Sequence, residues 1–572
     1  MLHVTLLDGY VDEPTCLGVP PYISPYPRYL AGVVWDAVPS ARVTYLTIDQ
    51  LRASNMYADA LQHADIVIVI AGMAVPGRYL SGYPISPREV VAILSPLTKP
   101  LTFLCGPAAR YGFGMTGGKQ PIDTNMVEDV FDFIVSGDGE CVLAEVLADQ
   151  QHFDSVDPSQ CRTDAHAIAP YASKGATIVT QHPFFPHHLI TEIETYRGCP
   201  RSIVGGCSFC SEPRKGAPDF RPIQDIVNEV AALYQAGIRH MRLGNQPCIF
   251  SYMAHDADSE EFPRPNPDAL QQLFSGIRRV APELHTLHVD NANPGVIARY
   301  PNEARTIANT IVQYHTPGDV AAFGVESVDP DVIKRNNLKA SEEEVYAAIT
   351  LLNDVGATRG HNGMPELLPG LNFVFGLKGE TKETFAQNYA FLKRVCDDNL
   401  LVRRINLRQV IPIPDTPLYT EGVRLITKHK HLFKQFKQHV QETIERPLLQ
   451  RLLPRQTVLT DVYTELHDGK LTLGRQMGSY PLLVGVPGIY ALHQFMDVSV
   501  VDYGYRSITA VPYPLEINTA PRETLEALPG VGKKRAIRIL ANRPYATAQQ
   551  FLASLDDASI GTQIMSYLSF EK

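Results

Sequence analysis

Residues 196–210 read Tyr196-Arg-Gly-Cys199-Pro-Arg-Ser-Ile-Val-Gly-Gly-Cys207-Ser-Phe-Cys210 and gather three of the nine cysteines of the chain on one glycine-rich loop. Thiolates bind soft metals, and three of them can hold an iron–sulfur cubane while leaving one iron open. Structural zinc normally has four protein ligands, so the loop favours a cluster. A zinc site completed by a distant histidine, or buried thiols without metal, are the alternatives. Arg197, Arg201 and Arg214 are expected to favour the thiolate forms.

The rest of the chain is long enough for several hydrophobic cores. At 572 residues it has room for about three to five domains. A net charge of −10 with 45% hydrophobic residues is typical of a globular protein and argues against disorder and against coating of nucleic acid by bulk charge. Residues 1–13 lack a signal-peptide pattern and no apolar run reaches membrane-spanning length. We therefore expect a cytoplasmic protein without a membrane partner.

Apolar runs alternate with amphipathic stretches through most of the chain, which indicates an α/β fold. Residues 1–150 predict a doubly wound, Rossmann-like parallel sheet, and the polar stretch 151–185 predicts a linker. Residues 186–435 predict a partial or full (β/α) barrel, whose working end is the C-terminal edge of its strands. Residues 436–510 predict a helical and β-rich module, and residues 511–572 a helical hairpin domain.

Three cysteines that lead into the first helix of such a barrel resemble the radical S-adenosylmethionine (radical SAM) superfamily. That family usually leaves three residues between the first two cysteines, whereas seven stand here, and Gly205 with Gly206 can form the extra turn. Gly324-Val-Glu-Ser327 with the following Val332–Lys339 resembles the fourth strand of the family and the segment after it. Phe375-Gly376-Leu-Lys-Gly379-Glu380-Thr381 resembles its fifth-strand turn.

The resemblance implies a role for each matching residue. Cys199, Cys207 and Cys210 would hold a [4Fe-4S] cluster. The S-adenosylmethionine would be bound by Phe209 against the adenine, by Arg242, Asn245 and Gln246 near the methionine amino group, by Glu326 and Ser327 near the ribose or carboxylate, and by the turn at Gly376. Radical chemistry depends on excluding water more than on acids and bases, so no residue is assigned as catalytic acid or base.

The end of the N-terminal domain resembles cobalamin-binding domains that are fused to radical SAM barrels. Phe131-Asp-Phe-Ile-Val-Ser-Gly137-Asp-Gly139-Glu140 is similar to their final strand and turn, and Leu104-Cys-Gly106-Pro107 to the turn before it. The resemblance implies cobalamin near Gly106, Gly137, Gly139 and Glu140. A nucleotide-binding or purely structural sheet is the alternative.

The first strand lacks the histidine that such domains offer to cobalt. Asp8-Gly-Tyr10-Val-Asp-Glu13 stands in place of Asp-x-His-x-x-Gly. We therefore expect cobalamin near Asp8 and Tyr10 with no histidine below the metal. The loop of residues 72–79 would face that side, with Met73 as its candidate contact.

The C-terminal segment Leu528-Pro-Gly-Val-Gly-Lys533-Lys534-Arg535 resembles a helix-hairpin-helix. In that motif, amides of the Gly-x-Gly turn meet a phosphate beside a helix N-terminus, and the three basic residues add positive charge. This predicts a nucleic-acid contact that is non-specific in sequence. A protein-docking or packing role for the hairpin is the alternative.

Together these features predict a cobalamin-dependent radical SAM C-methyltransferase that methylates an unactivated sp3 carbon. One S-adenosylmethionine would supply the methyl group through cobalamin and a second the radical that abstracts hydrogen. The chain organisation is also similar to that of methanogen enzymes that methylate a glutamine of methyl-coenzyme M reductase, so the alpha chain of that enzyme is the leading protein substrate. A ferredoxin or flavodoxin would donate electrons. The alternatives are a radical SAM enzyme that modifies tRNA or other nucleic acid, and a zinc-containing nucleic-acid-binding module without catalysis.

Overall fold

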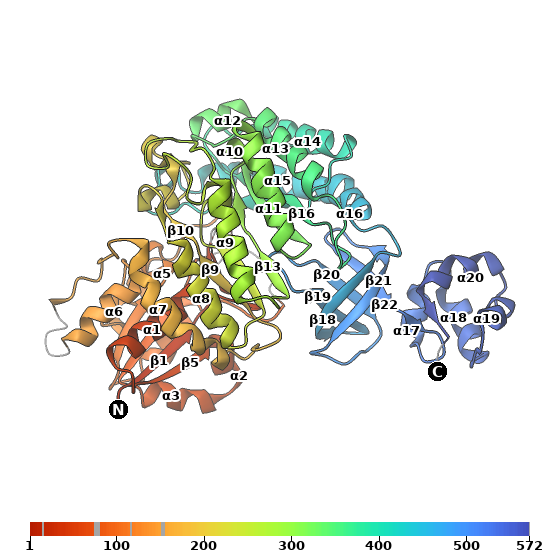
Figure 1. Ribbon diagram of the computed structural model, residues 1–572, viewed down its shortest axis with the longest axis horizontal. Helices are drawn as coiled ribbons and strands as arrows, with labels where there is room; N and C mark the ends of the chain where they lie inside the picture. Colours follow the sequence, from red (N-terminus) through yellow and green to blue (C-terminus); the bar gives the residue numbers. More distant parts are fainter. Residues whose placement is uncertain (14–15, 74–79, 115–116, 150–154, 571–572) are drawn as a thin grey trace.

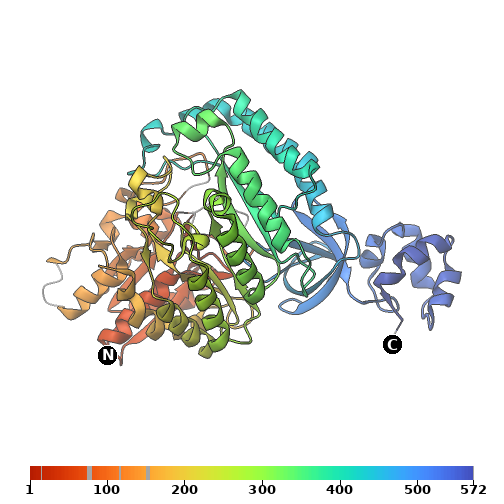
Figure 2. The same ribbon diagram turned by 45° about the horizontal axis from the view of Figure 1, so that its top comes forward.

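The structure, a computed structural model, describes residues 1–13, 16–73, 80–114, 117–149 and 155–570. Along the chain it forms a parallel sheet, a partial barrel, a small closed β-barrel and a helical C-terminal domain (Figure 1). Both views place the last domain at one end of the molecule, beyond the small barrel (Figures 1 and 2). The predicted α/β class is confirmed. None of the described helices has both the length and the apolar composition of a bilayer-spanning segment.

The N-terminal sheet is fully parallel and has the strand order β5-β1-β6-β7-β8. Its strands are β1 (His3–Asp8), β5 (Arg42–Thr47), β6 (Ile66–Ile70), β7 (Leu101–Cys105) and β8 (Phe133–Ile134). The run Ile-Val-Ile-Val-Ile of β6 is buried on both faces, as expected for a central parallel strand. Its isoleucines pack with α1 (Pro25–Ala37) and α6 (Gly139–Ala148), and its valines with α2 (Ile48–Ala53) and α4 (Pro87–Leu94).

The segment that was expected as a linker is helical where the structure describes it. It contains η5 (Ala165–Ile168), α7 (Ala169–Lys174) and η6 (Gly175–Gln181), which pack on α1. A Cβ at Gly32 would lie 2.0 Å from the carbonyl oxygen of Tyr171, and one at Gly175 1.7 Å from that of Arg28. Glycine is therefore needed at both contacts. The linker prediction is wrong for 165–181, because small residues let these helices pack closely without an amphipathic period.

The central domain contains two parallel sheets, of which one ends at β13 and the next begins at β14, and helices surround them. Its strands are β9 (Ile190–Glu194), β12 (His240–Gly244), β13 (Thr286–His288), β14 (Asn291–Ala292), β15 (Asp319–Glu326), β16 (Leu367–Phe375) and β17 (Arg404–Gln409). The main outer helices are α8 (Ile223–Gln235), α9 (Pro267–Val280), α11 (Pro301–Tyr314), α13 (Glu342–Gly356) and α14 (Lys382–Asp397). The short N-terminal strand β4 (Tyr22–Ile23) pairs with β9, so the described pairing ends at β4 on one side and at β17 on the other. The barrel is therefore partial and has one open side.

The β-rich module is a closed five-stranded barrel that follows α15 (Arg424–Val440) and α16 (Arg446–Leu452). Its strands are β18 (Val458–Asp468), β19 (Leu471–Gln476), β20 (Leu483–Pro487), β21 (Phe495–Tyr503) and β22 (Ser507–Pro512). They close in the order β18-β19-β20-β22-β21, with β20 and β22 parallel and the other pairs antiparallel. This is the topology of the OB fold, a barrel that commonly binds oligonucleotides or oligosaccharides.

The C-terminal domain contains the predicted helical hairpin. Helices α17 (Arg522–Ala527) and α18 (Gly532–Ala541) are joined by a turn in which Gly530 and Gly532 have φ of 76° and 52°. Helices α19 (Ala548–Ser554) and α20 (Ala558–Ile564) complete the domain. Helix α17 packs on β20 and β22, and the hydroxyls of Tyr490 and Thr524 lie 2.7 Å apart, so the hairpin is fixed to the OB barrel.

A fully buried ion triad joins the N-terminal sheet domain to the barrel. Glu229 on α8 lies 2.6 Å from Arg28 of α1 and 2.6 Å from Arg221, and none of the three side chains reaches solvent. Arg28 also donates to the carbonyl oxygen of Glu192 on β9 at 2.7 Å. Burial opposes ionisation, but Arg221 and Arg28 together hold the pKa of Glu229 below its usual value. The carboxylate is thus the shared counter-ion of two domains.

Replacing this carboxylate should destabilise the protein strongly. We expect Glu229→Ala to lower the free energy of unfolding by about 3–5 kcal/mol, because it leaves two guanidinium groups buried without a counter-ion. Urea denaturation checks this, with Asp354→Asn as the control, since the Arg305–Asp354 pair is about half exposed and is expected to contribute about 1 kcal/mol or less. Equal losses in both variants would contradict the role of the triad.

The triad should also make stability depend on pH. A carboxyl group whose pKa is lower in the folded state than in the unfolded state stabilises the protein at pH values above its unfolded-state pKa. This stabilisation is lost as the pH falls through the pKa of the folded state. We therefore expect the wild-type protein to lose unfolding free energy below about pH 4.5, the ordinary range of a glutamate. Glu229→Ala should show a shallower loss over the same interval.

Candidate functional site

The cysteine loop follows β9 and β10 (Tyr196–Arg197) at the mouth of the barrel. After Cys199 the chain forms a short 3-10 helix, η7 (Pro200–Val204), and then passes through Gly205 and Gly206 with φ of 81° and 66°. The seven-residue gap therefore makes one extra turn before Cys207. The role predicted for the two glycines is confirmed, since both adopt the left-handed conformation.

The segment after β15 holds this loop in place. The Asn337 side chain donates to the carbonyl oxygens of Val204 and Gly206, both at 2.9 Å. The backbone amide of Ser208 donates to the Asn336 carbonyl oxygen at 3.0 Å, and its hydroxyl to the Asn336 side chain at 2.8 Å. The stretch Val332–Lys339, singled out from the sequence, thus positions the cysteines.

Of the three arginines expected to act on the thiols, Arg201 reaches one. Its Nη1 donates to Cys207 Sγ at 3.1 Å. Arg197 instead pairs with Asp138 and Asp219, and Arg214 lies 3.5 Å from the carbonyl oxygen of Gly205. Arg197 and Arg214 therefore do not contact the thiols as expected. Arg197 is paired with two carboxylates that are distant in the sequence, and Arg214 faces a backbone carbonyl oxygen.

Lys339 supplies the second positive charge near the thiols. Burial lowers its pKa, but Glu326 and the three thiols raise it above the ordinary lysine value. A Cβ at Gly324 would lie 2.3 Å from Lys339 Nζ and 2.4 Å from Glu326 Oε1, so a larger residue there would displace both charged groups. Lys339 was not identified as a site residue from the sequence, although it lies at the end of the recognised segment.

These groups surround a cavity of about 200 Å³ at the barrel mouth, called here the cluster cavity. Its lining includes Cys207, Phe209, Cys210, Glu326, Lys339 and Met73. Burial raises the pKa of Glu326 to about 7, while Lys339 and Arg408 oppose the shift. The cavity therefore presents thiols, an aromatic ring and a carboxyl–ammonium pair to one small volume.

The three thiols are a candidate ligand set for an iron–sulfur cluster. Among the residues that the structure describes, no three His, Cys, Asp or Glu side chains converge on one ion position. In a cubane each thiolate binds a different iron, so its ligands do not converge on one point. Burial raises the pKa of Cys199 to about 12, so that thiol stays protonated until a metal binds.

Five of the predicted S-adenosylmethionine residues lie outside the cluster cavity, and one of them, Asn245, lines a different cavity. Arg242 pairs in the barrel core with Glu192 at 3.4 Å and with Asp290. Gln246 donates to the Leu243 carbonyl oxygen at 3.3 Å. The remaining two have local structural contacts: the Ser327 hydroxyl accepts from the Asp329 amide, and the Gly376 amide donates to Glu380. Phe209 and Glu326 are brought together as expected.

A second cavity of about 470 Å³, called here the sheet-edge cavity, lies between the N-terminal sheet and the barrel. It is lined by Gly106, Gly137, Gly139 and Glu140 from the ends of β7 and β8 and by Asn245 from the barrel. Arg110, Arg214 and Lys215 also line it. The sequence-predicted cobalamin residues at this edge are therefore gathered at one site.

Backbone packing requires glycine at two positions of this edge. A Cβ at Gly137 would lie 2.1 Å from the Gln160 carbonyl oxygen, and one at Gly106 2.7 Å from that of Ala71. Both glycines therefore allow one backbone to pack directly on another.

Asp8 and Tyr10 line neither cavity. Asp8 is buried and accepts from the Tyr10 amide at 2.8 Å and the Tyr45 hydroxyl at 2.7 Å, and burial raises its pKa to about 6. Tyr10 donates to Asp49 at 2.9 Å. Met73, in contrast, lines the cluster cavity and packs with Tyr111 of the sheet domain. The rest of that loop, residues 74–79, lies outside the described residues.

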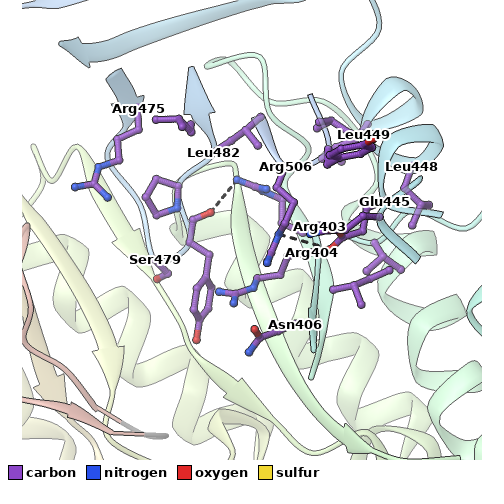
Figure 3. Close-up of a pocket in the computed structure, with 18 of the residues that line it drawn as sticks. Arg403, Arg404, Asn406, Glu445, Leu448, Leu449, Arg475, Ser479, Leu482 and Arg506 are labelled. Carbon is purple, nitrogen blue, oxygen red and sulfur yellow. Dashed lines mark hydrogen bonds and ion pairs between the residues drawn. The ribbon is translucent and has the colours of Figure 1, made fainter. Parts of the chain in front are cut away.

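A third cavity of about 680 Å³, called here the arginine cavity, lies at the open side of the barrel (Figure 3). It is bounded by residues 19–22, by β17, by α16 and by two loops of the OB barrel. Arg403, Arg404, Arg408, Arg475 and Arg506 line it. The sequence analysis missed this cavity, although two adjacent arginines before a predicted strand are an unusual signal.

Comparison with known proteins agrees with this geometry. Residues 193–392, which include the three cysteines and most of the barrel, match the family model described as the radical SAM superfamily. The chain belongs to the radical SAM superfamily. Members of it use a [4Fe-4S] cluster and S-adenosylmethionine, as predicted here for Cys199, Cys207 and Cys210.

Two archaeal proteins are similar to this radical SAM protein over nearly its whole length. It is 47% identical over 508 residues to the uncharacterized protein MJ0274 of Methanocaldococcus jannaschii, covering 88% of this chain and 92% of the relative. It is 44% identical over 538 residues to an uncharacterized protein of Archaeoglobus fulgidus, covering 94% and 95%. The three chains form one family.

Among solved structures, a radical S-adenosylmethionine methyltransferase, TsrM of Kitasatospora setae, aligns with a TM-score of 0.47 at 16% identity, covering 74% of this chain and 76% of the other.

Alanine at the two glycines of the loop should have different effects. We expect Gly206→Ala to lose most of the bound iron after anaerobic reconstitution, because its Cβ would lie 2.2 Å from Pro213 Cγ. Gly205→Ala also has positive φ but has no atom within 4 Å of the new Cβ, so it should cost about 1 kcal/mol of backbone strain and keep its iron. Iron and sulfide analysis compares them, and equal iron contents would refute the packing argument.

Proposed function

We propose that the protein is a cobalamin-dependent radical SAM C-methyltransferase. The observation that carries this proposal is the contact between the ligand-binding edge of the N-terminal sheet and the barrel mouth. Met73 and Tyr111 of the sheet domain pack with Ile413, which follows β17, and Gly118 donates to the Val410 carbonyl oxygen at 3.1 Å. Parallel sheets of this order bind ligands beyond their strand ends, which here face the thiols.

The residues of the sheet-edge cavity would hold the polar tail of cobalamin. Arg110, Arg214 and Lys215 line that cavity and offer positive charge to a phosphate. Met73 and Tyr111 join the two cavities, since Met73 lines the cluster cavity and Tyr111 the sheet-edge cavity. A macrocycle bound at this junction would face the cluster cavity, with Met73 as the nearest sulfur ligand on the sheet side.

The cluster cavity would bind S-adenosylmethionine beside the cluster. Phe209 would lie against the adenine, and Glu326 with Lys339 would bind polar groups of the ribose or methionine. When bound, the cluster supplies the electron that cleaves S-adenosylmethionine, and cobalamin supplies the methyl group. The chain contributes a hydrogen bond from Arg201 to Cys207 and a buried cavity that would limit access of water to the reactive carbon.

The substrate is a separate part of the proposal. A glutamine in the alpha chain of methyl-coenzyme M reductase is the protein substrate predicted from the chain organisation, and a ferredoxin or flavodoxin the electron donor; a cytoplasmic location likewise stays a prediction. A nucleic-acid substrate is the second candidate, and a specific observation favours it: the OB barrel follows the catalytic barrel and borders its open side, and the hairpin domain follows the OB barrel.

Metal analysis tests the cofactors. After anaerobic purification with cobalamin supplied, we expect iron and cobalt in a ratio of about four to one, because one cubane and one corrin would bind per chain. An absorption spectrum should lack histidine coordination to cobalt. Iron without cobalt would refute the proposal that the protein binds cobalamin. Zinc as the only bound metal would refute the proposal that it is a radical SAM enzyme.

Matched cysteine variants separate the two cofactor sites. Cys207→Ala should lose the iron and the cleavage of S-adenosylmethionine but keep the cobalt, because the sheet-edge cavity does not depend on that thiol. Cys396→Ser, on the outer helix α14, should keep both metals. If Cys207→Ala lost both cobalt and iron while Cys396→Ser kept them, the proposal of two separate cofactor sites would be contradicted.

A further inference from the structure

The arginine cavity adjoins the cluster cavity. Asn406, Arg408 and Tyr480 line both, so a ligand in the arginine cavity lies next to the reactive volume. The cavity opens at β17, where the partial barrel has its free edge, and the OB barrel contributes Tyr480 and the β21–β22 loop to it (Figure 3).

Positive charge dominates the lining of this cavity. Two of its five arginines have carboxylate partners: Arg475 bonds to Glu465 at 3.0 Å, and Arg506 lies 3.5 Å from Glu445. Arg403, Arg404 and Arg408 have no carboxylate within salt-bridge distance among the described residues. These three guanidinium groups therefore form no salt bridge with the described residues, although Glu326 lies near Arg408 and Glu445 near Arg404.

These guanidinium groups are held in place while part of their hydrogen-bonding capacity stays unused. Arg404 stacks on the Tyr480 ring at 4.1 Å, and Arg403 donates to the Tyr480 carbonyl oxygen at 2.9 Å. The Nε atoms of Arg403 and Arg404 are buried and lack a partner. Burial and the neighbouring arginines lower the pKa of both side chains to about 10. An oxyanion in the cavity would supply the missing acceptors and charge.

The surroundings of the cavity match a polymer of phosphates with stacking groups. Tyr505, in the β21–β22 loop, lines the cavity and is 47% exposed. Phe495 on the same barrel is 42% exposed. OB folds bind single strands by stacking bases on such aromatic side chains while basic residues follow the backbone. In the hairpin domain, Lys533 and Lys534 are exposed beside the Gly530–Gly532 turn, whereas Arg535 is paired with Asp556.

We infer that the arginine cavity binds backbone phosphates of a single-stranded nucleic acid, and that the OB barrel presents this strand to the cluster cavity. Arg403, Arg404 and Arg408 would contact phosphate oxygens, for which the planar guanidinium fork is well suited. Tyr505 would stack on a base at the cavity mouth. The inference rests on the proposed function for the fate of the bound nucleotide, but binding itself does not require the cofactors.

The test is fluorescence anisotropy with the full-length protein and three probes of similar charge: a labelled mixed-sequence RNA 12-mer, the same sequence as DNA, and a polyglutamate peptide. We expect nucleic acid to bind and the peptide not to bind. Arg404→Gln should weaken nucleic-acid binding about tenfold, as expected for loss of one charged hydrogen-bonding contact. The slope of log K against log salt should fall by about 0.7, the value for one phosphate on a single strand.

Matched variants exclude general charge and folding effects. Arg305→Gln removes the same charge from the exposed face of α11 and should bind like the wild type. Tyr505→Ala changes an exposed side chain, so it should fold normally and weaken binding to both nucleic acids about tenfold. Tighter binding of RNA than of DNA would support the inference and would indicate a contact to the 2′-hydroxyl group. Equal binding of RNA and DNA would also support the inference.

Two results would overturn the inference that the arginine cavity binds nucleic acid. One is an unchanged nucleic-acid affinity in both Arg404→Gln and Tyr505→Ala. The other is that the protein binds only the peptide and that this binding depends on Arg404. The proposed function can fail while the inference holds: cobalt or iron would then be absent from the protein, but the nucleic acid would still bind. Iron content measured on each variant distinguishes these cases, because loss of the cluster does not remove the arginine cavity.

Discussion

The carboxylate of Glu229 fixes the geometry on which both cofactor proposals depend. It pairs with both Arg28 of the N-terminal domain and Arg221 of the barrel domain, and none of the three side chains is exposed to solvent. Because a buried charge without its partner is costly, the two domains cannot separate or slide without exposing or stranding one of these ions. The sheet edge and the barrel mouth therefore keep a fixed spacing, and the cavities between them are preformed.

Much of the fold follows from local sequence, but the sites depend on distant contacts. The alternating β-branched run of β6 and the cysteine spacing with its two glycines predict their structures because the physical causes are local. Helix α7 was missed because glycine-mediated close packing leaves no period to detect. Arg197 could not be assigned from sequence, since Asp138 and Asp219 reach it only in the folded chain.

Tyr480 shows how one residue links three units. It lies in a loop of the OB barrel, donates a hydrogen bond to Asp290 at 2.6 Å, and stacks with Arg404 on β17. Arg403 and Arg404 become a binding surface only because this ring and its carbonyl orient them. The OB barrel thus completes a wall of the catalytic barrel, which explains why no sequence pattern within residues 186–435 identified the cavity.

The pairing of β4 with β9 has a consequence for folding. Residues 22 and 23 precede the first helix, yet they cover the outer edge of the first barrel strand. A chain cut down to the family region 193–392 would lose β4 and the first three residues of β9, which would leave the backbone of β12 unpaired, and exposed strand edges recruit other chains into aggregates. The folded barrel therefore extends beyond the region that matches the family model and includes residues 22 and 23.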